Sequence, residues 1–140
     1  MKIFIICSKR FYDRIPPIQS ELEAAGHIIT LPNSYHDPLM EERMRAQGEG
    51  IHAAWKARMI HQSAAVISNM DAVLVLNFEK NGMQNYIGGA TFLEMYEAWK
   101  LGKSIYMYND IPEGMLKDEI CGFSPVLIHG DLSKLSSIVL

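Results

Sequence analysis

The sequence has little cysteine, little excess charge of one sign and no long apolar run. Its two cysteines, Cys7 and Cys121, lie far apart in apolar surroundings, which indicates buried thiols in a reducing compartment rather than a disulfide or a metal pair. The net charge of −3 gives no electrostatic reason to expect a nucleic acid or a membrane surface as partner. No segment approaches membrane-spanning length, and the N-terminal apolar run is too short for a signal peptide, so we expect a cytoplasmic protein.

The five histidines show none of the spacings typical of a zinc site, and the sequence predicts neither a metal nor a cofactor. What the chain does have is apolar residues, which make up 49% of its 140 positions. A chain of this length and composition can bury a core without disulfides or metals. We therefore expect one domain over residues 1–140.

Short apolar runs rich in β-branched residues alternate with helical patterns. The predicted strands cover residues 2–7, 27–31, 73–76, 105–108 and 125–128. The predicted helices cover residues 16–25, 51–70, 88–101 and 132–137, with shorter ones between 35 and 50 and over 115–120. Strands alternating with helices require parallel pairing and right-handed crossovers. The sequence thus predicts an α/β fold, a doubly wound, mainly parallel five-stranded sheet in the order 2-1-3-4-5 with helices on both faces.

In this topology a ligand binds beyond the carboxyl ends of the first and third strands, where the strand order reverses. The residues that we expect there are Ser8, Lys9, Arg10, Asn77, Gly88 and Gly89. Two glycines at a helix start let a ligand approach unpaired N–H groups that favour an anion, and Thr91 lies in the first turn of that helix. The alternative is that Gly88 and Gly89 only turn the chain and that Thr91 helps to cap the helix.

Glu94 is the most informative residue of this helix. On a helix its neighbours are Ala90, Ala98 and Leu101, so it lies on a small, apolar stripe with no basic residue four positions away. Burying a carboxylate at such a position costs free energy unless the carboxylate faces a polar cavity. Functional carboxylates are found in cavities of this kind. The alternative is a helix rotated so that Glu94 is merely solvated.

Four segments, KIFIICSKRFY, NSY, DAVLVLNFE and IGGATFLEMYEAWKLGKSIYMY, occur in an order that resembles the nucleoside 2-deoxyribosyltransferase superfamily, which includes deoxynucleoside-monophosphate N-glycosidases. The resemblance covers most of the chain. It implies that Glu94 is a nucleophile that attacks the anomeric carbon of a (deoxy)ribosyl group. It further implies that Gly88, Gly89 and Thr91 hold a phosphate or sugar hydroxyl, that Ser8 and Lys9 lie opposite, and that Asn77 contacts the ribose or base.

The chain departs from this family at two positions. Gly88 stands where members often place a ligand-binding Ser or Asp, and Ser63, eight residues before Asp71, stands where they place an aspartate that handles the proton of the base. GGATFLE also resembles the PGGxGTxxE motif of the phosphoribohydrolases that activate cytokinins, although Ile87 replaces the proline.

The expected function is an N-glycosidase or deoxyribosyltransferase acting on a nucleoside or nucleotide. The alternatives are a binding module that senses such a ligand without turnover, a phosphoribohydrolase-like enzyme, and a scaffold.

The resemblance implies a homodimer or a higher homo-oligomer, because family active sites are completed by a neighbouring subunit. The aromatic residues Phe92, Tyr96 and Trp99 of the glycine-opened helix could form such an interface, or could pack on the sheet.

Overall fold

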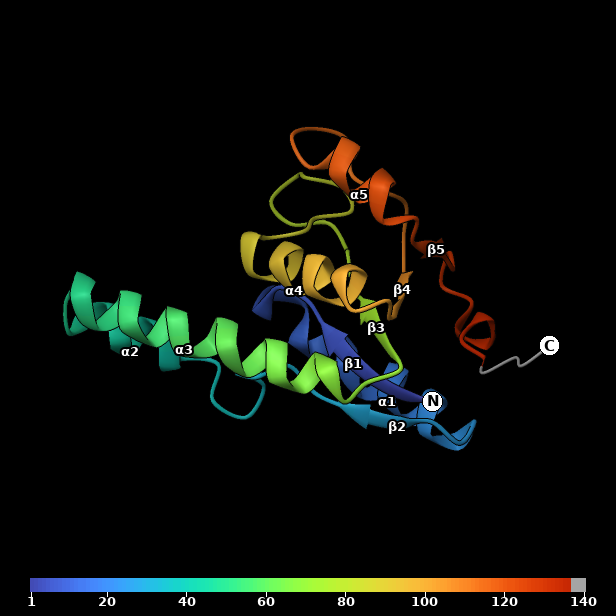
Figure 1. Ribbon diagram of the computed structural model, residues 1–140, viewed down its shortest axis with the longest axis horizontal. Coiled ribbons are helices and arrows are strands. Elements are labelled where there is room, and N and C mark those ends of the chain that lie inside the picture. The colour runs from blue at the N-terminus through green and yellow to red at the C-terminus, as the bar shows by residue number, and fades with distance from the viewer. Residues whose placement is uncertain (137–140) are drawn as a thin grey trace.

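The structure is a computed structural model that describes residues 1–136. Its strands are β1 (Lys2–Ile6), β2 (Ile28–Thr30), β3 (Ala72–Val75), β4 (Ser104–Met107) and β5 (Val126–Leu127). They form one five-stranded sheet in the order β2-β1-β3-β4-β5, and every neighbouring pair is parallel (Figure 1). The doubly wound α/β fold and the strand order predicted from the sequence are confirmed.

The helices are α1 (Ile15–Ala24), α2 (Met40–Ala46), α3 (Glu49–Ser68), α4 (Gly89–Lys100) and α5 (Lys117–Phe123), with two 3₁₀ helices, η1 (Lys9–Arg14) and η2 (Leu132–Lys134). The sequence did not predict η1, which begins where the Ser8 hydroxyl accepts a hydrogen bond from the Arg10 N–H. The final helix predicted over residues 132–137 is only the turn η2, and Ser137 lies outside the described residues.

Successive strand residues bury their side chains on opposite faces of the sheet, which gives the molecule two apolar cores. Ile3 and Ile5 of β1 pack on one face together with residues of α1 and η2. Phe4 and Ile6 pack on the other face, under residues of α3, α4 and α5. Helices thus cover both faces, as predicted.

Helix α3 contacts the sheet only through its C-terminal end, while its first half pairs with α2 and extends beyond the sheet (Figure 1). Ile67 near the C-terminus is fully buried, whereas Ile51 in the first turn is 45% exposed. The long helix predicted over residues 51–70 is therefore present, with Trp55 and Ile67 buried and Ile51, which has no sheet beneath it, exposed. In between, α3 runs beside α4 and brings Ser63 close to the start of that helix.

The predictions for the two cysteines and for the aromatic residues of α4 are each confirmed in part. Cys7 is buried at the end of β1, but Cys121 is exposed on α5, because this short helix buries only Ile120. Of the aromatic side chains of α4, Phe92 packs against the core on the sheet. Tyr96 and Trp99 are about half exposed and pack against Phe123 of α5. None of the helices within residues 1–136 is long and apolar enough to cross a membrane.

Candidate active site

A cavity of about 550 Å³ lies between the carboxyl end of β1, the start of α4 and one side of α3. The segment after β2, helix α2 and the loop between β3 and α4 complete its wall. This volume lies within the range of sites that bind small molecules. Its place at the switch between β1 and β3 is where the topology predicts a ligand.

Glu94 lies on the cavity wall, in the second turn of α4. Its carboxylate accepts a hydrogen bond from the Ser63 hydroxyl of α3, with Oγ 2.7 Å from Oε2. The two helices lie side by side, so residues from separate parts of the chain form one polar contact on the cavity wall. Glu94 is therefore positioned by a partner rather than solvated at the surface.

Asn33 extends this contact into a chain of hydrogen bonds. Its Nδ2 donates to the Ser63 Oγ at 2.7 Å, so the Ser63 hydroxyl accepts one hydrogen bond and donates its own hydrogen to Glu94. Gln62 in turn donates to the Asn33 Oδ1 at 3.3 Å. Each donor fixes the direction of the next hydroxyl or amide, and the result is a carboxylate held through Oε2.

The surroundings of Glu94 change its acidity. Burial raises the pKa of the Glu94 carboxyl to about 7, against the opposing effects of the Ser63 hydrogen bond and the positive charge of Lys56. A carboxyl with this pKa changes charge near neutral pH, which suits a group that takes part in chemistry.

Gly88, Gly89 and Thr91 line the cavity, although Thr91 is only 3% exposed. Gly88 precedes the first turn of α4 and provides no side-chain cap. A Cβ at position 88 would lie 3.3 Å from the Tyr86 hydroxyl oxygen, so the phenol occupies the space that a side chain would need. The first N–H groups of α4 have no partners within the helix and face this end of the cavity.

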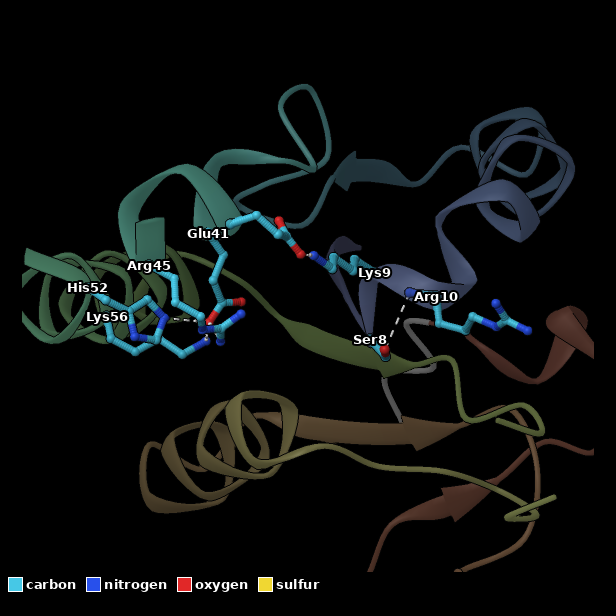
Figure 2. A network of polar contacts seen from close by, with 8 residues as sticks. Ser8, Lys9, Arg10, Glu41, Arg45, His52 and Lys56 are labelled. Atoms are coloured by element: carbon cyan, nitrogen blue, oxygen red, sulfur yellow. Dashed lines mark hydrogen bonds and ion pairs between the residues drawn. The ribbon is translucent and has the colours of Figure 1, made fainter. Parts of the chain in front are cut away.

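The basic turn after β1 divides between the cavity and another surface. Ser8 and Lys9 line the cavity, and Lys9 forms an ion pair with Glu42 of α2. Arg10 was expected in the same crevice, but its side chain points away from it (Figure 2) and lies with Phe78 and Glu79 in a separate depression. The reason is η1, whose tight turns send consecutive side chains in different directions.

Asn77 was also expected at the ligand, and its side chain is fully buried away from the cavity. It donates to the Asn109 and Asp110 carbonyls at 3.3 and 2.9 Å and accepts from the Asn109 N–H at 2.8 Å. Asn77 therefore ties the loop after β3 to the loop after β4. From the sequence, an amide at the end of a strand could either bind a ligand or tie two loops together. Only the packing distinguishes these two roles.

Sequence reasoning missed the polar cluster at the α2 side of the cavity, which we call the Glu41 cluster and define as Glu41, Arg45, His52 and Lys56. The Glu41 Oε2 lies 2.9 Å from His52 Nε2, 3.0 Å from Lys56 Nζ and 3.4 Å from the Arg45 guanidinium (Figure 2). Burial favours a raised pKa for Glu41, but the hydrogen bonds from His52 and Lys56 outweigh it and hold the pKa below its usual range. The spacing of His52 and Lys56, one turn apart on α3, was the available signal.

Trp55 and Tyr12 also line the cavity, and neither was singled out from the sequence. Trp55 is 6% exposed and stacks on His52, with ring centroids 6.2 Å apart. Burial and nearby acidic groups raise the pKa of the Tyr12 phenol, so it stays protonated. Burial together with the charge of Glu94 also raises the pKa of the Cys7 thiol, to about 12, which leaves Cys7 unsuited to act as a nucleophile.

No protein-family model matches the chain, and no curated protein matches it at a significant level.

Proposed function

We propose that the protein cleaves the N-glycosidic bond of a nucleoside or nucleotide, with Glu94 as the nucleophile. The observation that carries this proposal is the Glu94 carboxylate on a ligand-sized cavity, held through Oε2 by Ser63. Within the described residues no hydrogen bond to Oε1 is present, so that oxygen is available to a ligand. A carboxylate with one oriented, unbonded oxygen suits attack on an anomeric carbon.

In the proposed reaction, the Glu94 carboxylate attacks the anomeric carbon while the bond to the base breaks. Water, or a second base in a transferase, then resolves the glycosyl ester. The Ser63 and Asn33 hydrogen bonds keep the carboxylate in one orientation and reduce the reorganisation needed for attack. Gly88, Gly89 and Thr91 provide backbone N–H groups for a phosphate or sugar hydroxyl, with Ser8 and Lys9 opposite.

The test is to incubate the protein with a panel of deoxynucleosides, ribonucleosides and their monophosphates and to measure the free base by chromatography. Glu94→Gln is the informative variant, because the amide keeps the size of the side chain and can still accept from Ser63. Base release by the wild type and not by Glu94→Gln supports the proposal. Equal release by both, or none by the wild type, rejects it.

A second candidate function is a module that binds a nucleotide without turnover. It is favoured by Ser63, which stands where the family that the chain resembles has an aspartate, and by Gly88, which lacks a polar side chain. A binding module is stabilised by its ligand and leaves that ligand intact. Thermal-shift screening with the same panel, followed by chromatography of the ligand after long incubation, separates the two functions.

We also propose that the protein forms a homodimer around this cavity. Ile60 of α3 and Leu93 of α4 line its open side and are 48% and 45% exposed, respectively. Apolar side chains at the rim of a polar site are typical of a surface that another subunit covers. Light scattering after size-exclusion chromatography measures the oligomeric state, and Leu93→Glu is expected to yield monomers.

A further inference from the structure

The proposed reaction needs a second group, because a purine or pyrimidine leaves a sugar faster when a proton donor stabilises the electron pair that it takes. The Ser63 hydroxyl lies close to Glu94 but does not fill this role. It already donates its hydrogen to Glu94 and accepts one from Asn33. Its proton is committed to holding the nucleophile.

The carboxyl groups on the cavity wall are also unsuited to give a proton. Within residues 1–136 these are Glu41, Glu94 and Glu97. Glu41 has a lowered pKa because its cluster partners stabilise the charged form, so it is an acceptor at neutral pH. Glu97 accepts from Lys100 Nζ at 2.9 Å. Glu94 is the proposed nucleophile and reacts as the carboxylate.

Three lysines line the cavity, and their partners differ. Lys9 is engaged by Glu42 of α2. The Lys80 ammonium lies 4.5 Å from the centre of the Tyr86 ring, at the glycine end of the cavity. Lys56 lies on the same face of α3 as Ser63, two turns earlier, and its charge acts on the Glu94 carboxyl. Of these cations, Lys56 is the one that shares a helix face with Ser63, the hydrogen-bond partner of Glu94.

Lys56 also lies beside an aromatic residue of the cavity wall. Its Nζ is 5.6 Å from the centre of the Trp55 ring, a buried aromatic surface on the cavity wall. The Glu41 Oε2 accepts from the Lys56 Nζ at 3.0 Å and fixes the side chain. An ammonium has three N–H groups, so Lys56 keeps donors for a ligand after this ion pair is formed.

We propose that Lys56 is a further catalytic residue, which hydrogen-bonds to the base of the bound nucleoside and gives it a proton as the glycosidic bond breaks. This inference rests on the proposed function. The Glu94 carboxylate forms a bond to C1′, the electron pair of the C1′–N bond passes to the base, and a Lys56 proton neutralises it. Water then adds to C1′, the ester bond returns its electron pair to Glu94, and the proton from water restores the Lys56 ammonium.

The experiment compares two substrates that differ only in their need for a proton. One is an unmodified purine deoxynucleoside, or its monophosphate if the wild type prefers it. The other is the same compound methylated at N7, whose base already carries a positive charge and leaves as a neutral molecule. Spontaneous loss of the methylated base is measured with Glu94→Gln and subtracted.

Lys56→Gln is expected to lower kcat for the unmodified purine by about 100-fold or more, the usual size of acid catalysis, and for the methylated purine by less than about fivefold. Lys56→Arg keeps the charge and the contact with Glu41 but does not release a proton, so it is expected to show the same selective loss. Arg58→Gln, an exposed basic residue of α3 outside the cavity, is the control and is expected to leave both rates within about twofold.

An equal loss on both substrates overturns the proposal, because a merely structural or binding role does not depend on the leaving group. Unchanged rates in Lys56→Gln overturn it as well. Should Lys56→Gln fail to fold, Lys56→Arg alone decides between these outcomes. A wild type that releases no base, or releases it equally as Glu94→Gln, rejects the proposed function and with it this inference, which is a different result from a Glu94-dependent enzyme that is insensitive to Lys56.

Discussion

The Ser63 hydroxyl donates a hydrogen bond of 2.7 Å to the Glu94 carboxylate across 31 residues of sequence. This hydrogen bond joins helix α3 to helix α4. The two helices lie side by side at the switch point of the sheet. It determines which carboxylate oxygen faces the cavity and how readily the carboxyl ionises. Three of the predictions below concern Glu94 and Ser63, and a fourth concerns Asn77, which lies away from the cavity.

Replacing Glu94 by glutamine is expected to lower the rate of base release by roughly 10³-fold or more, because loss of the proposed nucleophile removes the covalent route. Single-turnover assays at pH 7.5 measure the effect. Ligand binding measured by calorimetry should stay within about threefold of the wild type, because the amide retains the shape of the side chain. A rate for Glu94→Gln that matches the wild type would exclude the covalent mechanism.

Replacing Ser63 by alanine removes a donor that stabilises the charged form of Glu94. The pKa of Glu94 is therefore expected to rise further, and the acidic limb of the pH–rate profile should move to higher pH. At pH 7 the rate should fall by about tenfold, which corresponds to the ~1.5 kcal/mol of a hydrogen bond to a charged group. Ser63→Thr, which keeps the hydroxyl, is the matched control. A limb that stays in place in Ser63→Ala contradicts this role.

The stability of the protein should depend on the charge of Glu94. Its pKa is about 7 when folded against an ordinary value of 4.5, so the folded state binds the proton more tightly than the unfolded state does. The stabilisation is complete below pH 4.5 and is lost as the pH rises through 7, by up to ~3 kcal/mol. Urea unfolding at several pH values should show Glu94→Gln gaining stability over the wild type from pH 5 to pH 8. Parallel pH profiles for the two proteins would contradict the raised pKa.

Replacing Asn77 by alanine should destabilise the fold and leave ligand binding unchanged. The substitution removes three side-chain hydrogen bonds to Asn109 and Asp110 and leaves their backbone groups without these partners. We expect a loss of about 2–4 kcal/mol in the free energy of unfolding, measured by urea titration. Asn109→Ala breaks only the side-chain bond from Nδ2 to the Asn77 carbonyl and should cost less. An Asn77→Ala variant with normal stability and weakened ligand binding would return Asn77 to the site.

Much of this arrangement could be predicted from sequence because it depends on local patterns. Uninterrupted apolar runs such as residues 73–76 require a strand covered on both faces, and the helices between them leave few topologies. The glycine pair at 88 and 89 marks the start of α4, and the apolar stripe around Glu94 marks its inward side. These signals place Glu94 at the cavity without any knowledge of its partners.

The partners themselves could not be predicted in this way, since they come from segments that meet only after folding. In the sequence, Ser63 stands where the family that the chain resembles has an aspartate. In the structure, its hydroxyl donates the hydrogen bond that holds Glu94. Asn77 and Arg10 lie at the expected strand ends, but packing of the neighbouring loop and the turn of η1 direct their side chains elsewhere.

The sequence by itself determined the sheet, its order and the position of Glu94, because hydrophobic periodicity and turn residues act over a few positions along the chain. Only the tertiary structure decided which side chains share the cavity with Glu94. The Glu41 cluster and the hydrogen bonds from Asn33 through Ser63 depend on how α2 and α3 lie against α4 and the segment after β2. Contacts of this kind are set by packing between distant segments, which no local pattern encodes.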